Sequence, residues 1–149
     1  MKTEDFQTYG IVSFTPAEVR SVGSKVADLD LSLMVCAQKM RDELERRMKV
    51  LSLTGGTHKP GSEHYQGRAL DFTLYPEDGP VLISDVYKAA LVANFTGVGI
   101  YWNGAAWSFH VDVRSHFAFW SAVKNKRASN WSYLPLTLDE SYLQSLVTL

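Results

Sequence analysis

Apolar residues recur at helical spacing in two long stretches of the chain. Between residues 30 and 48 they stand three or four positions apart, and charged residues fill the opposite face. This pattern predicts an amphipathic helix that packs on a core. A second amphipathic helix is predicted over residues 81–95. A shorter helix is predicted to begin at Pro16, because Thr15 is a suitable N-cap and proline favours the first helical position.

Shorter apolar runs bounded by turn residues predict strands. We expect strands over residues 50–54, 69–74, 98–102 and 106–113. The last two are joined by Asn103 and Gly104, a pair typical of a tight hairpin turn. Residues 134–149 are expected to form a closing helix or a packed tail. This order of elements predicts an α+β fold in which a small, mostly antiparallel sheet packs with helices.

Length and composition fit a single domain that spans residues 1–149. The chain has 149 residues, of which 46% are hydrophobic and 21% charged, as in ordinary globular proteins. The formal net charge is -1, so no basic excess would attract nucleic acid or an anionic membrane. The single cysteine, Cys36, excludes an intrachain disulfide and a cysteine-rich zinc module. Nothing in the sequence argues for an oligomer, and we expect a monomer.

The N-terminal residues are polar and acidic, without the apolar stretch of a secretory signal peptide. No run approaches the roughly 18 consecutive apolar residues that a membrane-spanning helix needs. We therefore expect the protein to be made in a cytosol and not to insert into a membrane. If its target lies outside the membrane that encloses this cytosol, another component has to deliver the protein across that membrane.

Four histidines lie in the strand-rich middle of the chain, and two of them have carboxylates at ligand-like spacing. Asp71 follows His64 after a short loop, and Gly67 between them permits a tight turn. His110 and Asp112 share one face of a predicted strand, because strand side chains alternate. His64, Asp71 and His110 would offer a metal three ligands and an open fourth position, as in catalytic zinc sites. The spacing alone leaves open that these histidines are hydrogen-bonded core residues.

The residues on either side of these histidines make a more specific pattern. Residues 62–71 read Ser-x-His-x-x-Gly-x-Ala-x-Asp, Tyr101 follows, and residues 109–114 read Phe-His-Val-Asp-Val-Arg. This pattern resembles the zinc D-alanyl-D-alanine carboxypeptidase and L-alanyl-D-glutamate endopeptidase family, whose domain is shared with hedgehog signalling domains and many phage endolysins. The resemblance covers residues 31–120, from the long helix to the last ligand strand.

The resemblance implies a hedgehog/DD-peptidase-like fold and hydrolysis of a peptide bond in the stem peptide of bacterial peptidoglycan. Zinc (Zn²⁺) would be bound by His64, Asp71 and His110, where it would activate a water molecule and polarise the scissile carbonyl. The absence of a signal peptide fits a phage or prophage lytic enzyme. Such an enzyme is made in the host bacterial cytoplasm and acts on the cell wall after release.

The chain departs from this family at the position of the catalytic base. Many members have a glutamate three residues before the distal histidine, where this chain has Trp107. Asp112 is the replacement candidate, because it shares the strand face of His110. The alternative is that Asp112 orients His110 as a supporting carboxylate. His116 and Glu63 are further candidates for the base.

A second departure affects substrate binding. The family usually has Ser-Gly-Tyr-Arg at the end of the first strand, and this chain has Gly-Gly-Thr-His, so His58 replaces the arginine. We take His58, Ser62 and Arg68 as candidates for substrate binding. The alternatives are that Ser62 fixes the loop and that Arg68 is an exposed residue without a role. Some aromatic residues between positions 101 and 120 are candidates for a substrate groove, and most are expected in the core.

These departures keep a second function open. A chain without the glutamate and the arginine is also compatible with a zinc-binding structural or binding module, such as a virion or tail component that has lost hydrolysis. A third hypothesis is that the domain binds no metal. We expect the enzyme, a zinc metallopeptidase of the carboxypeptidase or endopeptidase type.

Overall fold

The computed structural model describes residues 1–125 and 127–147. Across these residues six strands form one sheet in the order β1-β2-β4-β3-β5-β6. The strands are β1 (Met48–Ser52), β2 (Ala69–Leu74), β3 (Gly97–Trp102), β4 (Trp107–Asp112), β5 (Ala118–Val123) and β6 (Ser132–Pro135). The helices are α1 (Asp5–Thr8), α2 (Pro16–Ser21), α3 (Leu31–Leu44), α4 (Ile83–Val92) and α5 (Glu140–Ser145), with 3-10 turns η1 (Val26–Asp28), η2 (Glu63–Gln66) and η3 (Pro76–Asp78).

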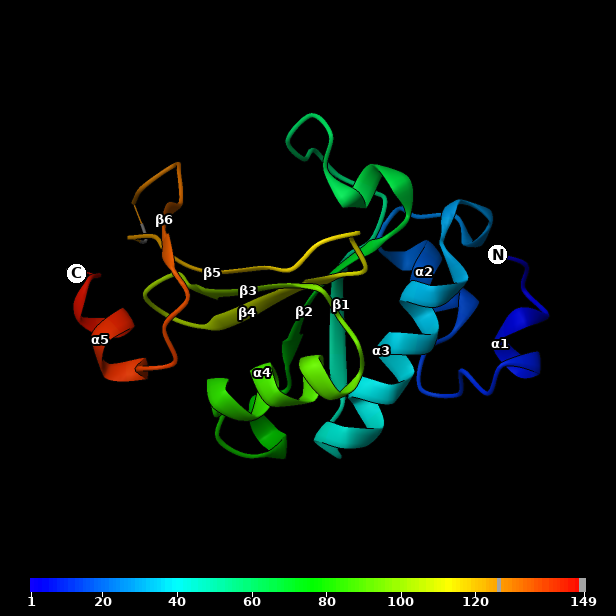
Figure 1. Cartoon of the computed structure of the whole chain (residues 1–149), viewed down its shortest axis with the longest axis horizontal. Coiled ribbons are helices and arrows are strands. Elements are labelled where there is room, and N and C mark those ends of the chain that lie inside the picture. Colours follow the sequence, from blue (N-terminus) through cyan, green and yellow to red (C-terminus); the bar gives the residue numbers. More distant parts are fainter. Residues whose placement is uncertain (126, 148–149) are drawn as a thin grey trace.

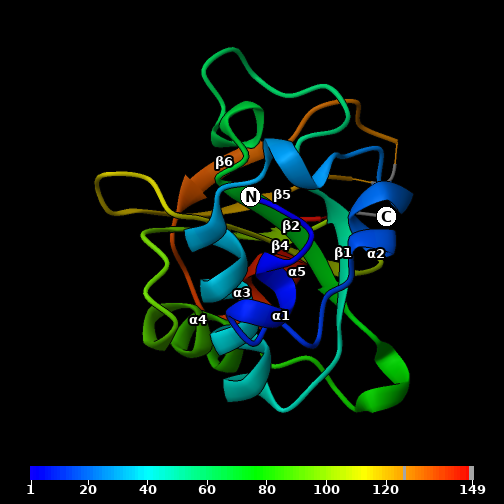
Figure 2. The ribbon, with the colours of Figure 1, turned by 90° about the vertical axis from the view of Figure 1, so that its right-hand side faces the viewer.

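The sheet is mixed and is covered by helices on one side. Only β3 and β5 pair in parallel among the described strands, and the other neighbours are antiparallel. Helices α3 and α4 lie together on one face, and the loop between β1 and β2 rises on the other (Figures 1 and 2). The prediction of an α+β fold with a mostly antiparallel sheet is confirmed.

Four strands place residues in one row across the middle of the sheet. Asp71 of β2 pairs with His110 of β4, His110 pairs with Gly99 of β3, and Gly99 pairs with Trp120 of β5. Because side chains alternate along a strand, this row faces away from α3 and α4. The intervening residues form the core with the helices and are at most 1% exposed: Leu70, Phe72, Val98, Ile100, Phe109 and Val111.

The sequence predicts the central strands and the start of α2 well. β2 has the predicted bounds 69–74, and β4 falls within the predicted 106–113. α2 begins at Pro16, and the Thr15 hydroxyl accepts a hydrogen bond from the backbone N–H of Glu18 at 3.1 Å. The alternation of apolar and polar residues and the capping chemistry are local signals, which explains their success.

The long helix predicted over residues 30–48 is wrong at its C-terminal end. α3 ends at Leu44, and Glu45 takes a left-handed conformation with φ 53° that turns the chain. β1 then begins at Met48, which is buried as a strand residue. The charged residues continue the helical pattern past the point where the backbone leaves it, so periodicity alone extends the helix.

The C-terminal segment is only partly helical. Residues 132–135 form β6, and α5 occupies 140–145, whereas one helix or tail was expected from residue 134 onward. Residues 148 and 149 of that prediction lie outside the described residues. Strand β5 was not predicted at all. In the described ranges, every helix is too short or too polar to span a membrane.

Candidate metal centre

Asp71 is the meeting point of two histidines on the open face of the sheet. Its Oδ1 lies 2.9 Å from Nδ1 of His110 and 3.2 Å from Nε2 of His64. His110 is its neighbour on β4, and His64 belongs to η2, which immediately precedes β2. Gly67 ends η2 with φ 69°, and a Cβ there would lie 1.9 Å from the backbone carbonyl oxygen of Asp28. The tight turn predicted at Gly67 is confirmed.

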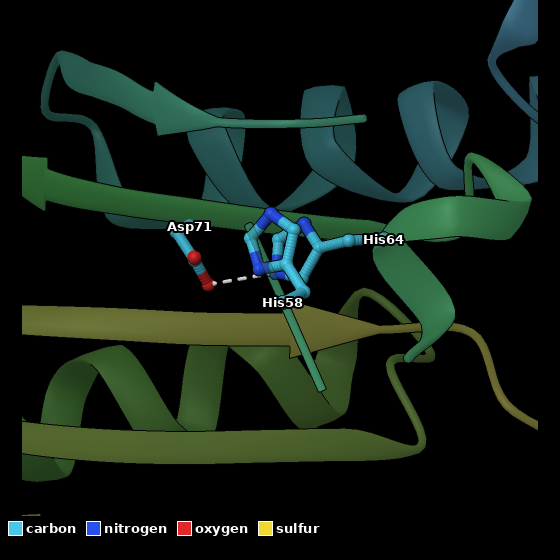
Figure 3. Close-up of side chains that lie close together, drawn as sticks. All are labelled: His58, His64 and Asp71. Atoms are coloured by element: carbon cyan, nitrogen blue, oxygen red, sulfur yellow. Dashed lines mark ion pairs between the residues drawn. The ribbon is translucent and has the colours of Figure 1, made fainter. Parts of the chain in front are cut away.

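A third histidine, His58, lies against His64 and close to Asp71 (Figure 3). Its ring stacks on that of His64, with centroids 3.9 Å apart and planes 8° apart. One donor atom each of His58, His64 and Asp71 lie within 4.8 Å of one another, so this group could hold a metal ion. His58 Nε2 lies 2.9 Å from the carbonyl oxygen of Gly55. Because a carbonyl only accepts, Nε2 carries a proton and Nδ1 of the neutral ring keeps a lone pair.

The hydrogen bonds of His64 fix which of its nitrogens faces Asp71. Nδ1 contacts the carbonyl oxygen of Leu53 and therefore carries a proton. In the neutral ring, Nε2 then directs a lone pair at the carboxylate of Asp71. Two lone pairs in contact repel unless a proton or another cation lies between them. The charge arrangement thus favours a bound cation at this point.

His110 lies between two carboxylates. Nδ1 faces Asp71, and Nε2 lies 2.7 Å from Oδ2 of Asp112. Burial lowers the pKa of His110, but hydrogen bonds to Asp112 and Asp71 outweigh it and leave the pKa above its ordinary value. Burial raises the pKa of Asp71, but the hydrogen bond with His110 and the contact with the His64 ring outweigh it and hold the pKa below its ordinary value. A metal at Nδ1 of His110 would replace the proton there. Nε2–H would still donate its hydrogen bond to Asp112, and such a hydrogen bond to a carboxylate commonly supports a ligating histidine.

The cluster opens into a cleft of about 800 Å³. The carboxylate side chain of Asp71 is 32% exposed to it, whereas that of His64 is 3% exposed. The loop between β1 and β2 lines one side of the cleft, and this loop stands above the sheet in Figure 1. Four aromatic residues also line the cleft: Tyr101, Trp120, Trp131 and Tyr133. This volume is in the range of pockets that take small-molecule ligands.

Asp112, the predicted catalytic base, is fully buried beneath His110 and is not among the described residues that line the cleft. Its Oδ1 accepts hydrogen bonds from the backbone N–H and Nε–H of Arg114, and its Oδ2 accepts from Arg114 and His110. Burial raises the pKa of Asp112, but Arg114 and His110 outweigh it and hold the pKa below its ordinary value. Gly97 makes room for this carboxylate, since a Cβ there would lie 2.1 Å from Oδ1. This is the position of a residue that orients His110.

The three residues predicted to bind substrate have different surroundings. His58 lines the cleft but also belongs to the group that could hold a metal. Ser62 accepts a hydrogen bond from the backbone N–H of His64 at 3.2 Å, and so caps η2. Arg68 donates a hydrogen bond from Nη2 to the backbone carbonyl of Val113, and its Nη1 lies 3.6 Å from Oε2 of Glu63. Ser62 is a cleft residue, and Arg68 is not among the described lining residues.

The position of the expected glutamate faces the core. Trp107 is buried, and its ring lies 4.7 Å from that of Trp102. The two other candidate bases, Glu63 and His116, both line the cleft. Oε2 of Glu63 is buried without a hydrogen-bond partner among the described residues.

Sequence reasoning missed the two glycines of β3 that shape the open face. A Cβ at Gly99 would lie 2.6 Å from the indole of Trp120, and one at Gly97 would collide with Asp112. Glycine weakens a strand and therefore marks a place where another group approaches closely. Two glycines on one face of an otherwise apolar strand are the signal that was available.

Comparisons with known proteins give no relative for this chain. No family model matches it, and neither a curated protein nor a solved structure matches it. Function is therefore inferred from the residue pattern and from the geometry of the site.

Proposed function

We propose that this chain is a zinc-dependent peptidase that hydrolyses a peptide bond in the stem peptide of bacterial peptidoglycan. One observation carries the proposal: nitrogens of His64 and His110 meet the carboxylate of Asp71 at the base of a cleft. The resemblance of residues 62–71 and 109–114 to zinc peptidases of the cell wall supports the substrate class. A phage or prophage lytic enzyme remains the form that this pattern favours.

Zinc is the metal that the donor set favours. Two imidazole nitrogens and one carboxylate oxygen with an open fourth position are typical of catalytic zinc, whereas calcium and magnesium prefer oxygen ligands. Two ligand atoms at about 2.1 Å from a tetrahedral zinc ion stand roughly 3.4 Å apart. The separations of 2.9 and 3.2 Å around Asp71 Oδ1 are close to that value. His64, Asp71 and His110 are the proposed ligands. His58 is the alternative to His110, because the group with donor atoms within 4.8 Å of one another consists of His58, His64 and Asp71.

Zinc at this site would supply a water molecule of lowered pKa and would polarise the scissile carbonyl. The chain's own residues orient and support this chemistry. Asp112 accepts the Nε2–H of His110 and keeps Nδ1 turned toward Asp71. Glu63 lines the cleft and precedes His64 in the chain, and we assign it the uptake of a proton from water.

The second candidate function is a zinc-binding module without hydrolysis. Its support is the sealed position of Asp112 and the presence of Trp107 where the related peptidases have glutamate. In that case the cleft binds the stem peptide and leaves it intact. The two functions share the metal site and differ only in whether the peptide is cut.

Purified peptidoglycan sacculi incubated with zinc-loaded protein test the proposal. We expect new amino groups with the wild type, none with Asp71→Asn, and a strong reduction with Glu63→Gln. Ser108→Ala is the matched control, because Ser108 also lines the cleft and is outside the proposed ligand set. Mass analysis of the products identifies the bond that is cut. One zinc per chain without new amino groups would favour the binding module, and a protein without zinc would exclude both.

A further inference from the structure

The hydroxyl of Tyr101 accepts a directed hydrogen bond in the wall of the cleft. Trp120 Nε1–H donates to it at 2.7 Å. Since an indole N–H can only donate, the tyrosine oxygen acts as acceptor and its own O–H proton is directed elsewhere. Tyr101 lines the same cleft as the three proposed zinc ligands.

The indole that holds this hydroxyl is itself held from several sides. It lies over Gly99, where a Cβ would come within 2.6 Å of it. Its ring centroid is 5.2 Å from that of His110, and the guanidinium of Arg114 lies 5.3 Å from it. The orientation of Tyr101 is therefore linked through Trp120 to the row that carries His110 and Asp71.

The surroundings of Tyr101 keep its proton in place. The ring meets Trp131 edge to face with centroids 4.9 Å apart, and it meets Tyr133 in the same manner at 6.3 Å. Burial raises the pKa of Tyr101, so the phenol is neutral and remains a hydrogen-bond donor at neutral pH. A neutral donor in an aromatic wall binds a developing negative charge more strongly than water does.

Two of the other donors near the cluster make hydrogen bonds of their own. His58, at the position of the arginine in related peptidases, directs Nε2 to the Gly55 carbonyl and stacks on His64. Arg114 uses Nε and Nη2 on Asp112. Cleavage of a peptide bond places negative charge on the carbonyl oxygen, and that oxygen needs a donor.

We propose that Tyr101 donates its hydroxyl hydrogen bond to the carbonyl oxygen of the scissile peptide bond, and that Trp120 positions it. This inference rests on the proposed peptidase function. The phenol keeps its proton throughout, so no bond to Tyr101 forms or breaks. Tyr101 is the catalytic residue in this assignment, and Trp120 is a positioning residue.

Tyr101→Phe tests the inference, because it removes only the hydroxyl. With muropeptides as substrate, we expect kcat to fall about 10²–10³-fold, the effect of removing one such donor, with KM and the zinc content unchanged. Tyr142→Phe is the matched control, since it removes the hydroxyl of an exposed tyrosine that is not among the described residues lining the cleft, and kcat should stay near that of the wild type. Trp120→Phe should lower kcat and leave KM unchanged. The double variant should be no slower than Tyr101→Phe alone.

A second measurement avoids dependence on turnover. A phosphinate pseudopeptide of the bond that the wild type cuts mimics the charged carbonyl, and its Kd is measured by calorimetry with zinc-loaded protein. We expect Tyr101→Phe to weaken binding of the phosphinate by a factor similar to the fall in kcat. Binding of the cleaved peptide product should stay unchanged. Thermal unfolding of each variant separates loss of folding from loss of the donor.

The outcomes distinguish this inference from the proposed function. If the wild type cuts muropeptides and Tyr101→Phe is no slower than Tyr142→Phe, the role of Tyr101 is overturned and the peptidase stands. If Tyr101→Phe raises KM at constant kcat, the hydroxyl binds substrate without stabilising the charge, and the inference is likewise overturned. If the wild type binds zinc and cuts nothing, both proposals fail together.

Discussion

The two faces of the central sheet are built by the same strands and differ in almost every physical respect. The face toward α3 and α4 carries Phe72, Phe109 and Val111, which are at most 1% exposed and have no polar side-chain atoms. The opposite face carries Asp71 and His110, whose charges compensate one another. Alternation along each strand places these sets one residue apart. The helix-covered face supplies the stability that lets the open face concentrate charged groups.

The charged groups of the open face need partners and space that the apolar covered face does not need. Asp112 is fully buried, and burying a carboxylate is costly unless it is paired and hydrogen-bonded. Arg114 and His110 supply those partners, and two glycines in β3 supply the space for Asp112 and Trp120. On the covered face the packing of apolar side chains is enough. Substitutions on the two faces should therefore have different consequences.

Phe109→Ala should have the largest effect on stability. Its side chain is 1% exposed and packs on Phe72 with ring centroids 5.3 Å apart, so truncation leaves a cavity. We expect a loss of about 3–5 kcal/mol in the free energy of unfolding, measured by urea denaturation of the metal-free protein. Ser108→Ala, the adjacent position on the open face, should change it by less than about 0.5 kcal/mol. Equal losses at both positions would contradict the division between the faces.

The sequence predicts the strands whose residues alternate better than the strands whose residues do not. Strong alternation fixes the bounds of β2 and the shared face of His110 and Asp112, because both follow from local periodicity. β5 escapes prediction, because its run Ala-Phe-Trp-Ser-Ala-Val does not alternate and its parallel pairing with β3 joins distant segments. β6 is a short, largely exposed strand with little apolar signal.

The site was predictable in its ligand types and less so in its arrangement. The pattern around residues 62–71 identifies His64 and Asp71, and the structure brings them together. The stacking of His58 on His64 depends on the path of a loop, which no periodic signal encodes. The burial of Asp112 depends on Gly97 in a neighbouring strand, a contact between residues far apart in the sequence.

Asp71→Asn should remove the stabilisation that zinc provides. A ligand at about 1,000 times its Kd stabilises a protein by about 4 kcal/mol, and we expect the wild type to gain this with zinc. The variant should unfold at the same urea concentration with zinc and with a chelator, because it loses the carboxylate that both histidines contact. If the wild type also unfolds at the same urea concentration with and without zinc, the charges of the open face balance without a metal.

Gly97→Ala should damage the open face from within the sheet. The new Cβ would lie 2.1 Å from Asp112 Oδ1, and overpacking of this kind costs about 1–3 kcal/mol. Displacement of Asp112 should also weaken zinc binding by about 10–100-fold, as loss of a supporting carboxylate does. Asp112→Asn, which keeps the volume, should show the loss of zinc affinity without the overpacking. Intact zinc affinity in both variants, measured by calorimetry, would remove Asp112 from the support of His110.

Tyr65→Phe should have the smallest effect, and it tests the loop above the open face. The Tyr65 hydroxyl accepts from the backbone N–H of His58 at 2.7 Å and donates to the His58 carbonyl at 2.9 Å. Loss of these bonds should cost about 1 kcal/mol, or roughly 2–4 °C in Tm for a chain of this size. Tyr142→Phe, at an exposed tyrosine of α5, should leave Tm unchanged.

The zinc affinity of Tyr65→Phe then decides the role of His58. If His58 is the third ligand, freeing its backbone should lower zinc affinity together with Tm, because the ligand is no longer pre-organised. If His110 is the third ligand, as we propose, Tm should fall while zinc affinity stays the same, since His110 is fixed by strand pairing with Asp71 and by Asp112. One zinc titration of Tyr65→Phe therefore distinguishes His110, a ligand on the sheet, from His58, a ligand on the loop. Zinc affinity stays unchanged in the first case and falls in the second.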